Sequence, residues 1–394
     1  MKFFLAAVAL SLFSHFAFSE GAQEIPVYKK LGDRRSEIVF PVYSNEEKQT
    51  VVSQVEIVLN DLFVHRFLKI QDFGESASFG PSLEKIKGQM SSMTETDFHR
   101  SIANIFYSIR DLHTGYGFPT PYSCFTAMLP FTLTPAVDNS GENVIAVNSV
   151  LKTDPIIALI PDAKKISLGD VLISFDGVLA REAALEMAKT AAGANDAAWF
   201  KRGVSRLASR PGYRMLVPEK NTVQLKFKNR LGQNYELELP WLAKANVECL
   251  NPSAEKKSIA KNMGSAFDRE QLELQETFKN AQKSRLWALT PTVEPIFSFA
   301  LVDNENGSYG VLRLESFTPS KISVNELILL IRSTIIEKMQ NTDGIIFDLR
   351  NNGGGQIYLA EGLVQLFTMN TIAPLGFQLL NSPTNQALAN TLSF

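Results

Sequence analysis

Cysteine and histidine are scarce in this chain of 394 residues, which has two cysteines and four histidines. Cys124 and Cys249 do not form a C-x-x-C pair, and no group of histidines and cysteines has the spacing of metal ligands. We therefore expect no metal and no cofactor. The wide separation of the two cysteines leaves open whether they form a disulfide.

The chain also has little net charge, −2, which gives no support for nucleic-acid binding. Its one long apolar run, from Phe3 to Phe18, is too short to cross a bilayer comfortably and follows Lys2. A small-x-small sequence ends at Ser19, which predicts a cleaved signal peptide over residues 1–19. We expect an exported protein, periplasmic or secreted, without stable membrane insertion; an uncleaved anchor is the alternative.

The most informative stretch lies near the end of the chain. Residues 344–348 are mainly apolar and predict a short buried strand, Gly353-Gly354-Gly355 interrupts it, and residues 357–367 have helical apolar spacing. Backbone N–H groups at such a turn can hold a phosphate, a carboxylate or an oxyanion. The alternative is that the turn binds no ligand and its glycines only allow close packing of the backbone. A nucleotide site is weakly supported, because the G-x-G-x-x-G spacing and a Walker lysine are both lacking.

The residues from Asp348 to Gly355, DLRNNGGG, closely resemble the signature of the C-terminal processing (tail-specific) serine proteases and the related tricorn core protease. The resemblance implies that amides of Gly353 and Gly354 stabilise the oxyanion of an acyl-transfer intermediate. It also implies a polypeptide substrate, with Asn352 and Gly355 among the residues that bind it.

One histidine lies in a loop rather than in a helical pattern or the leader. His113 follows a predicted helix and has Asp111 two positions before it, and histidine suits general-base chemistry. The loop is similar to that of the tricorn-like branch, in which a histidine from this region is the base, whereas the better-known processing proteases use a Ser–Lys dyad. Asp111 either orients His113 or caps nearby backbone amides.

Residues 45–110 have a helical pattern, with helices expected over 45–70, over 82–90 and from a capped start at Thr94. From Leu129 the pattern changes to strands. Residues 166–177 resemble the late-strand signature of a PDZ domain, a module that binds the C-terminal ends of peptides by strand addition. The resemblance makes Phe131 a substrate-binding candidate. Its segment lacks the usual glycine-containing carboxylate loop, so capture of peptide ends stays open.

These patterns predict a multidomain α/β fold with an incomplete protease core of the ClpP/crotonase-like type. Six regions are expected: the signal peptide (1–19), a helical cap (20–125), a PDZ-like domain (126–215), a β-hairpin of the protease core (216–252), a charged helical insert (253–292) and the α/β protease core (293–394).

The resemblance also implies a serine on a later strand-to-helix turn. Ser382 and Ser393 follow the glycines, but neither lies in a matching sequence. We therefore expect an exported serine-type endopeptidase whose chain ends here before the nucleophile, so that this chain itself is inactive. The alternative is a catalytically inactive peptide-binding protein that uses the PDZ-like domain.

Overall fold

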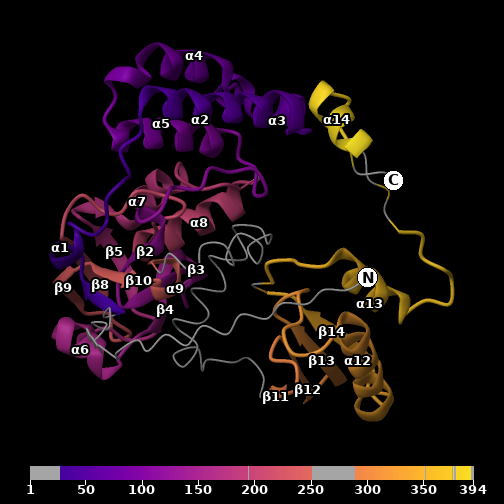
Figure 1. Ribbon diagram of the computed structural model, residues 1–394. Coiled ribbons are helices and arrows are strands. Elements are labelled where there is room, and N and C mark those ends of the chain that lie inside the picture. Colours follow the sequence, from indigo (N-terminus) through magenta and orange to yellow (C-terminus); the bar gives the residue numbers. More distant parts are fainter. Residues whose placement is uncertain are drawn as a thin grey trace, which may run out of the picture.

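A computed structural model shows a helical region, a central pair of sheets and a C-terminal α/β unit (Figure 1). The structure describes residues 27–193, 195–250, 289–350, 352–374, 376 and 379–391. The predicted signal peptide, most of the charged insert and Ser393 lie outside the described residues. No helix in the described ranges is long and apolar enough to span a membrane.

The helical region forms from sequences with strong start signals. Ser44 and Glu47 make a reciprocal capping box, and the Thr94 hydroxyl accepts a hydrogen bond from the Asp97 amide. A π-helical turn and a short loop break the single helix expected over residues 45–70. The elements are α2 (Asn45–Ile57), η1 (Val58–Leu62), α3 (Arg66–Phe73), η2 (Gly74–Ala77), α4 (Gly80–Gln89), η3 (Met90–Ser92) and α5 (Glu95–Ser108).

A six-stranded sheet follows the helical region. Its order is β3-β4-β5-β8-β9, and β6 pairs with β5. The strands are β3 (Phe131–Val137), β4 (Asn143–Val150), β5 (Val171–Phe175), β6 (Val178–Leu179), β8 (Thr222–Lys228) and β9 (Asn234–Pro240). The β8–β9 hairpin was assigned to the protease core, and this assignment is wrong. The hairpin pairs with β5 instead, because its alternating apolar residues face the same core as β3 to β5.

A second sheet, of order β1-β10-β2-β7, shares that core. Its strands are β1 (Tyr28–Lys30), β2 (Phe125–Met128), β7 (Ser209–Pro211) and β10 (Leu242–Ala245). Cys124 and Cys249 form a disulfide beside it, with Cα atoms 5.4 Å apart. The accompanying helices are α1 (Leu31–Arg34), η4 (Tyr122–Cys124), α6 (Asp154–Leu159), η5 (Pro161–Lys165), α7 (Ala180–Ala188), α8 (Asp196–Ala208) and α9 (Val247–Leu250).

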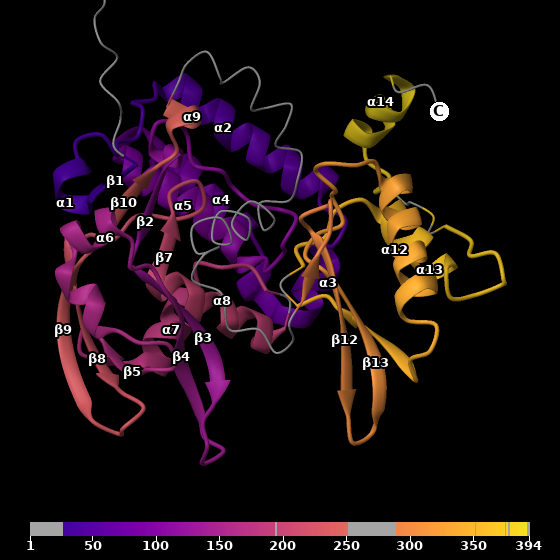
Figure 2. The same cartoon turned by 90° about the horizontal axis from the view of Figure 1, so that it is seen from below.

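The C-terminal unit is a third sheet with helices on one side (Figure 2). Its elements are β11 (Thr290–Pro291), β12 (Phe297–Asn304), β13 (Gly307–Leu314), α12 (Val324–Lys338), β14 (Gly344–Asp348) and α13 (Ile357–Gln365). Strands β13 and β14 are parallel, as the strand–helix–strand order predicted. A last helix, α14 (Pro383–Thr391), lies beside η1, where Thr384 donates a hydrogen bond to Asp61.

One prediction for this unit is wrong. Strand β14 was expected to be buried, but Ile346 and Phe347 are 40% and 39% exposed. Among the described strands β14 lies at the end of its sheet and pairs only with β13, so its outer side is open. The α/β, multidomain character is as predicted, while the PDZ-like and ClpP-like assignments stay predictions.

Candidate active site

The glycine turn lies where two parallel strands end together. Strand β14 leads into residues 349–355, and the adjacent strand β13 leads into the loop of residues 315–322. Loops that leave the carboxyl ends of parallel strands meet at one edge of the sheet. Phe317 accordingly lies against the turn. Its N–H donates to the Gly354 carbonyl at 2.7 Å, and its carbonyl accepts from the Gln356 N–H at 3.0 Å.

The backbone of the turn requires glycine at two positions. Gly354 and Gly355 have φ values of +105° and +137°, which other residues adopt only with strain. A Cβ on Gly355 would also lie 2.5 Å from the Phe317 carbonyl carbon. Gly355 forms a parallel bridge to Phe317 and does not line the pocket described below. In this structure Gly355 packs two loops together, and the substrate contact that the resemblance implied stays a prediction.

An ion-pair network fixes the start of the turn. Asp348 is buried and forms ion pairs of 2.8 Å with Arg313 and 2.7 Å with Arg350. The Arg350 hydrogen bond, with the Arg313 contacts, holds the pKa of Asp348 well below its ordinary value although burial opposes ionisation. The carboxylate therefore stays charged at neutral pH and ties the end of β14 to β13.

Asn352 holds the middle of the turn through both ends of its side chain. Its Nδ2 donates to the Leu314 carbonyl at 3.0 Å, and its Oδ1 accepts from the Gly354 N–H at 2.8 Å. The Gly354 amide was expected to face an oxyanion, but in this structure it is already bonded. The Gly353 amide has no acceptor among the hydrogen bonds of the described residues, which makes it the amide that a ligand can use.

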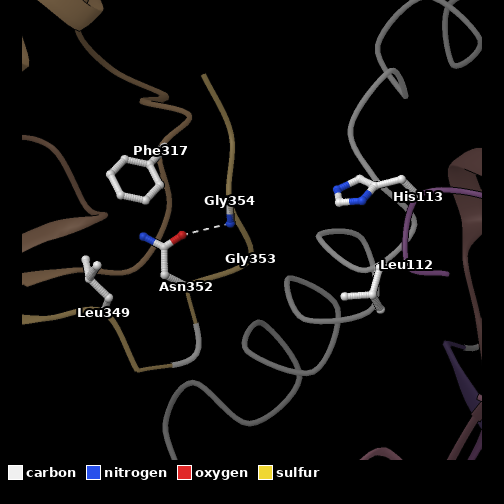
Figure 3. Close-up of a pocket in the computed structure, with 7 residues that line it drawn as sticks. All are labelled: Leu112, His113, Phe317, Leu349, Asn352, Gly353 and Gly354. Atoms are coloured by element: carbon white, nitrogen blue, oxygen red, sulfur yellow. Dashed lines mark hydrogen bonds between the residues drawn. The ribbon is translucent and has the colours of Figure 1, made fainter. Parts of the chain in front are cut away.

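His113 reaches the same place from the other end of the chain. A pocket of about 340 Å³ is lined by residues from both sides, and in Figure 3 the imidazole lies across the pocket from Gly354. Its lining residues are Leu112, His113, Phe317, Leu349, Asn352, Gly353 and Gly354. The structure thus brings His113, Asn352, Gly353 and Gly354 together, as a common site requires.

Asp111 caps the loop rather than the imidazole. Its Oδ1 accepts hydrogen bonds from the His113 N–H at 2.8 Å and the Thr114 N–H at 2.9 Å, while its Oδ2 lies 3.5 Å from Nδ1 of His65. Of the two roles left open for Asp111, the structure shows the capping one. No hydrogen bond among the described residues involves the His113 ring, so the ring is free to bond a substrate group.

Phe131 is not part of this site. It is 1% exposed, and its ring packs edge-to-face against Phe227 with centroids 5.7 Å apart. The prediction that Phe131 binds substrate is therefore wrong, because β3 directs this side chain into the core that two sheets share.

Sequence reasoning missed three apolar residues that line the pocket, Phe317, Leu112 and Leu349. A signal for Phe317 was present, since it follows the strand predicted to pair in parallel with the strand before the glycine turn. Glu294 was also missed. Its carboxylate is 0% exposed and accepts hydrogen bonds from three consecutive backbone amides, Ser320 to Ile322, which holds the Phe317 loop in place.

Comparison with known proteins adds a likeness in fold. No known family model matches the chain. No curated protein sequence matches it either. The crystal structure of mature CPAF superimposes with a TM-score of 0.57 over 81% of this chain and 58% of that chain, at 17% sequence identity. The chain resembles CPAF in fold. Mature CPAF complexed with lactacystin gives a TM-score of 0.55 at 17% identity, over 81% of this chain and 59% of that chain.

The chain therefore spans less than three-fifths of the length of CPAF. A photosystem II D1 C-terminal processing protease aligns over 82% of this chain and 65% of that chain, at 13% identity. Its TM-score of 0.31 is too low to carry an argument. These structures do not support the tricorn-core branch over its relatives, and at such identities they show the fold alone.

Proposed function

We propose that this pocket binds a peptide bond of a polypeptide and forms the base and oxyanion parts of a serine-type endopeptidase. The observation that carries the proposal is that His113 and Gly353, far apart in sequence, line one pocket. Acyl transfer needs a base and an oxyanion donor that flank a single carbonyl carbon. The resemblance of residues 348–355 to the tail-specific signature and the likeness in fold to CPAF support the same reaction class.

In this mechanism a serine hydroxyl attacks the scissile carbonyl carbon while His113 accepts the hydroxyl proton. The carbonyl oxygen becomes an oxyanion and accepts a hydrogen bond from the Gly353 N–H. His113 then gives the proton to the leaving amine, and water releases the acyl group by the same route in reverse. The assignment of His113 as base, and with it the histidine-based tricorn-like branch, is part of the proposal. Export of the protein and the PDZ-like identity of residues 126–215 are also part of the proposal.

None of the described side chains that line the pocket is a serine. Ser382 is buried, and its Oγ accepts a hydrogen bond from the Asn385 N–H at the start of α14, which is the role of a helix cap. We propose that the nucleophile lies outside the residues described here.

Peptide binding by the purified chain tests the site directly. An unstructured casein-derived peptide is titrated into isotopically labelled protein, and casein hydrolysis is assayed in parallel. We expect shifts of the His113 ring and Gly353 amide signals and weaker binding by the His113→Gln variant. Binding that leaves both signals unmoved would overturn the site. Hydrolysis that a serine-directed inhibitor blocks would support the serine-type reaction.

A catalytically inactive peptide-binding protein is the second candidate, and the lack of a serine among the described lining residues favours it. The two candidates differ in turnover. Cleavage by any longer product of the gene, abolished by His113→Gln, supports the peptidase. Binding without turnover by such a product supports the binding protein.

A further inference from the structure

The pocket has a side-chain composition that selects what can enter it. Apart from His113 and Asn352, the described side chains that line it are those of Leu112, Phe317 and Leu349. Among the described residues, no Asp, Glu, Lys or Arg lines it. A charged group that left water here would find no opposite charge among the lining residues, whereas an apolar group would gain from burial.

Backbone hydrogen bonds hold Phe317 in a fixed position relative to the glycine turn, which carries the proposed oxyanion donor, the Gly353 N–H. Both its backbone N–H and its carbonyl bond to the glycine turn, at Gly354 and Gln356. The buried Glu294 carboxylate holds the same loop a few residues further on. A side chain that is tied in this way to the carbonyl-binding turn can define which residue lies beside the bound carbonyl.

From these two observations we infer that Phe317, with Leu112 and Leu349, forms a subsite for an apolar side chain next to the bound peptide carbonyl. The ligand class is an internal polypeptide segment with a leucine- or phenylalanine-sized residue at that position. The cavity of about 340 Å³ lies at the lower end of the usual range for ligand pockets, roughly 300–1,000 Å³, which suits one large side chain and the adjoining backbone. This inference rests on the proposed function.

A peptide series tests the subsite in the full chain. Gly/Ser-rich peptides that carry Leu, Phe, Asp or Lys at one internal position are titrated while the His113 and Gly353 signals are followed. We expect the Leu and Phe peptides to bind at least tenfold more tightly than the Asp and Lys peptides. Phe317→Ala should remove most of this preference. Leu301→Ala is the matched control, because Leu301 is 53% exposed on β12 and does not line the pocket.

A second variant protects the test against misfolding. Leu349 is 44% exposed, so Leu349→Lys should fold, and it places a cation at the pocket. We expect this variant to bind the Asp peptide at least tenfold more tightly than wild type does. The subsite is overturned if all peptides shift both signals with equal affinity and Leu349→Lys does not bind the Asp peptide more tightly. The proposed function would then still stand. If no peptide shifts the two signals, the proposed function fails, and the subsite fails with it.

Discussion

The side-chain Oδ1 of Asn352 accepts a hydrogen bond from the backbone N–H of Gly354 at 2.8 Å. This bond decides which amide of the glycine turn is available. It removes Gly354 from the set of free donors and leaves Gly353, which lines the pocket that His113 also lines. A site that the sequence assigned to two glycine amides is therefore reduced to one amide and a positioning residue.

Replacement of Asn352 is expected to loosen the turn. Asn352→Ala removes the bonds to Leu314 and Gly354, which should lower the free energy of unfolding by about 1–2 kcal/mol and weaken peptide binding. Asn352→Asp keeps the acceptor for the Gly354 N–H and loses only the donor to Leu314, so it should retain more of the peptide affinity. Hydrogen exchange of the Gly354 amide measures this effect. The exchange should be slow in wild type and in Asn352→Asp and fast in Asn352→Ala. Equal exchange in all three proteins would contradict this role.

Glu294 is expected to control the Phe317 loop. Burial disfavours the charge of this carboxylate, but backbone amides of Lys321, Ser320 and Ile322 outweigh it and lower its pKa. Glu294→Gln should destabilise the fold by about 2–3 kcal/mol, since a charge-assisted acceptor is lost, and should weaken peptide binding. Because the folded-state pKa is lowered, this stabilisation is fully present above the unfolded-state pKa and is lost as pH falls from there through the folded-state pKa.

Urea denaturation at pH 7 and pH 3 checks that prediction. The difference in unfolding free energy between the wild-type and Glu294→Gln proteins should be larger at pH 7 than at pH 3. Glu305→Gln, in the exposed turn between β12 and β13, is the control and should change neither value. A difference between wild type and Glu294→Gln that is the same at both pH values would contradict the role of the charge.

His99 is expected to make the fold sensitive to acid. The ring is 0% exposed and stacks on Phe40, and its Nδ1 lies 2.6 Å from the Tyr116 hydroxyl. Burial lowers the pKa of His99 to about 4, Glu95 opposes the shift and Lys48 adds to it. The unfolded chain then binds more protons than the folded chain between about pH 6.5 and 4, so stability falls across that window as pH falls, by about 3 kcal/mol in total.

Denaturation profiles between pH 7 and pH 4 measure this effect. His99→Phe keeps an aromatic ring and removes the titration, so its profile should be flatter than that of wild type. His65→Gln serves as the control, because the His65 side chain is 55% exposed. Parallel wild-type and His99→Phe profiles would show that His99 does not cause the acid sensitivity.

The Cys124–Cys249 disulfide is expected to stabilise the central sheets. It closes a loop of about 125 residues, for which loop-closure entropy predicts a stabilisation of about 4–5 kcal/mol. Reduction with dithiothreitol should lower the urea midpoint of the wild-type protein. It should leave the Cys124→Ser/Cys249→Ser protein unchanged, and an unchanged wild-type midpoint would show that the bridge adds no stability.

Local order could be predicted from the sequence because it depends on neighbouring residues. Helix α5 begins at Thr94 since a threonine followed by Asp97 caps amides that a helix start leaves unpaired. The position of the glycine turn could be predicted because three consecutive glycines mark a turn, and glycine readily adopts the positive φ values found at Gly354 and Gly355. The parallel pairing of β13 and β14 followed from the strand–helix–strand order.

The tertiary structure alone decided which distant segments lie beside each other. The sequence does not say that the Gly354 amide is taken by Asn352, that Phe131 points into the core, or that the hairpin of residues 222–240 joins β5. Each of these depends on which apolar faces pack together, a competition among distant segments that local patterns do not record. The same packing places His113 and Gly353 at one pocket, because two loops of unrelated elements end on either side of it.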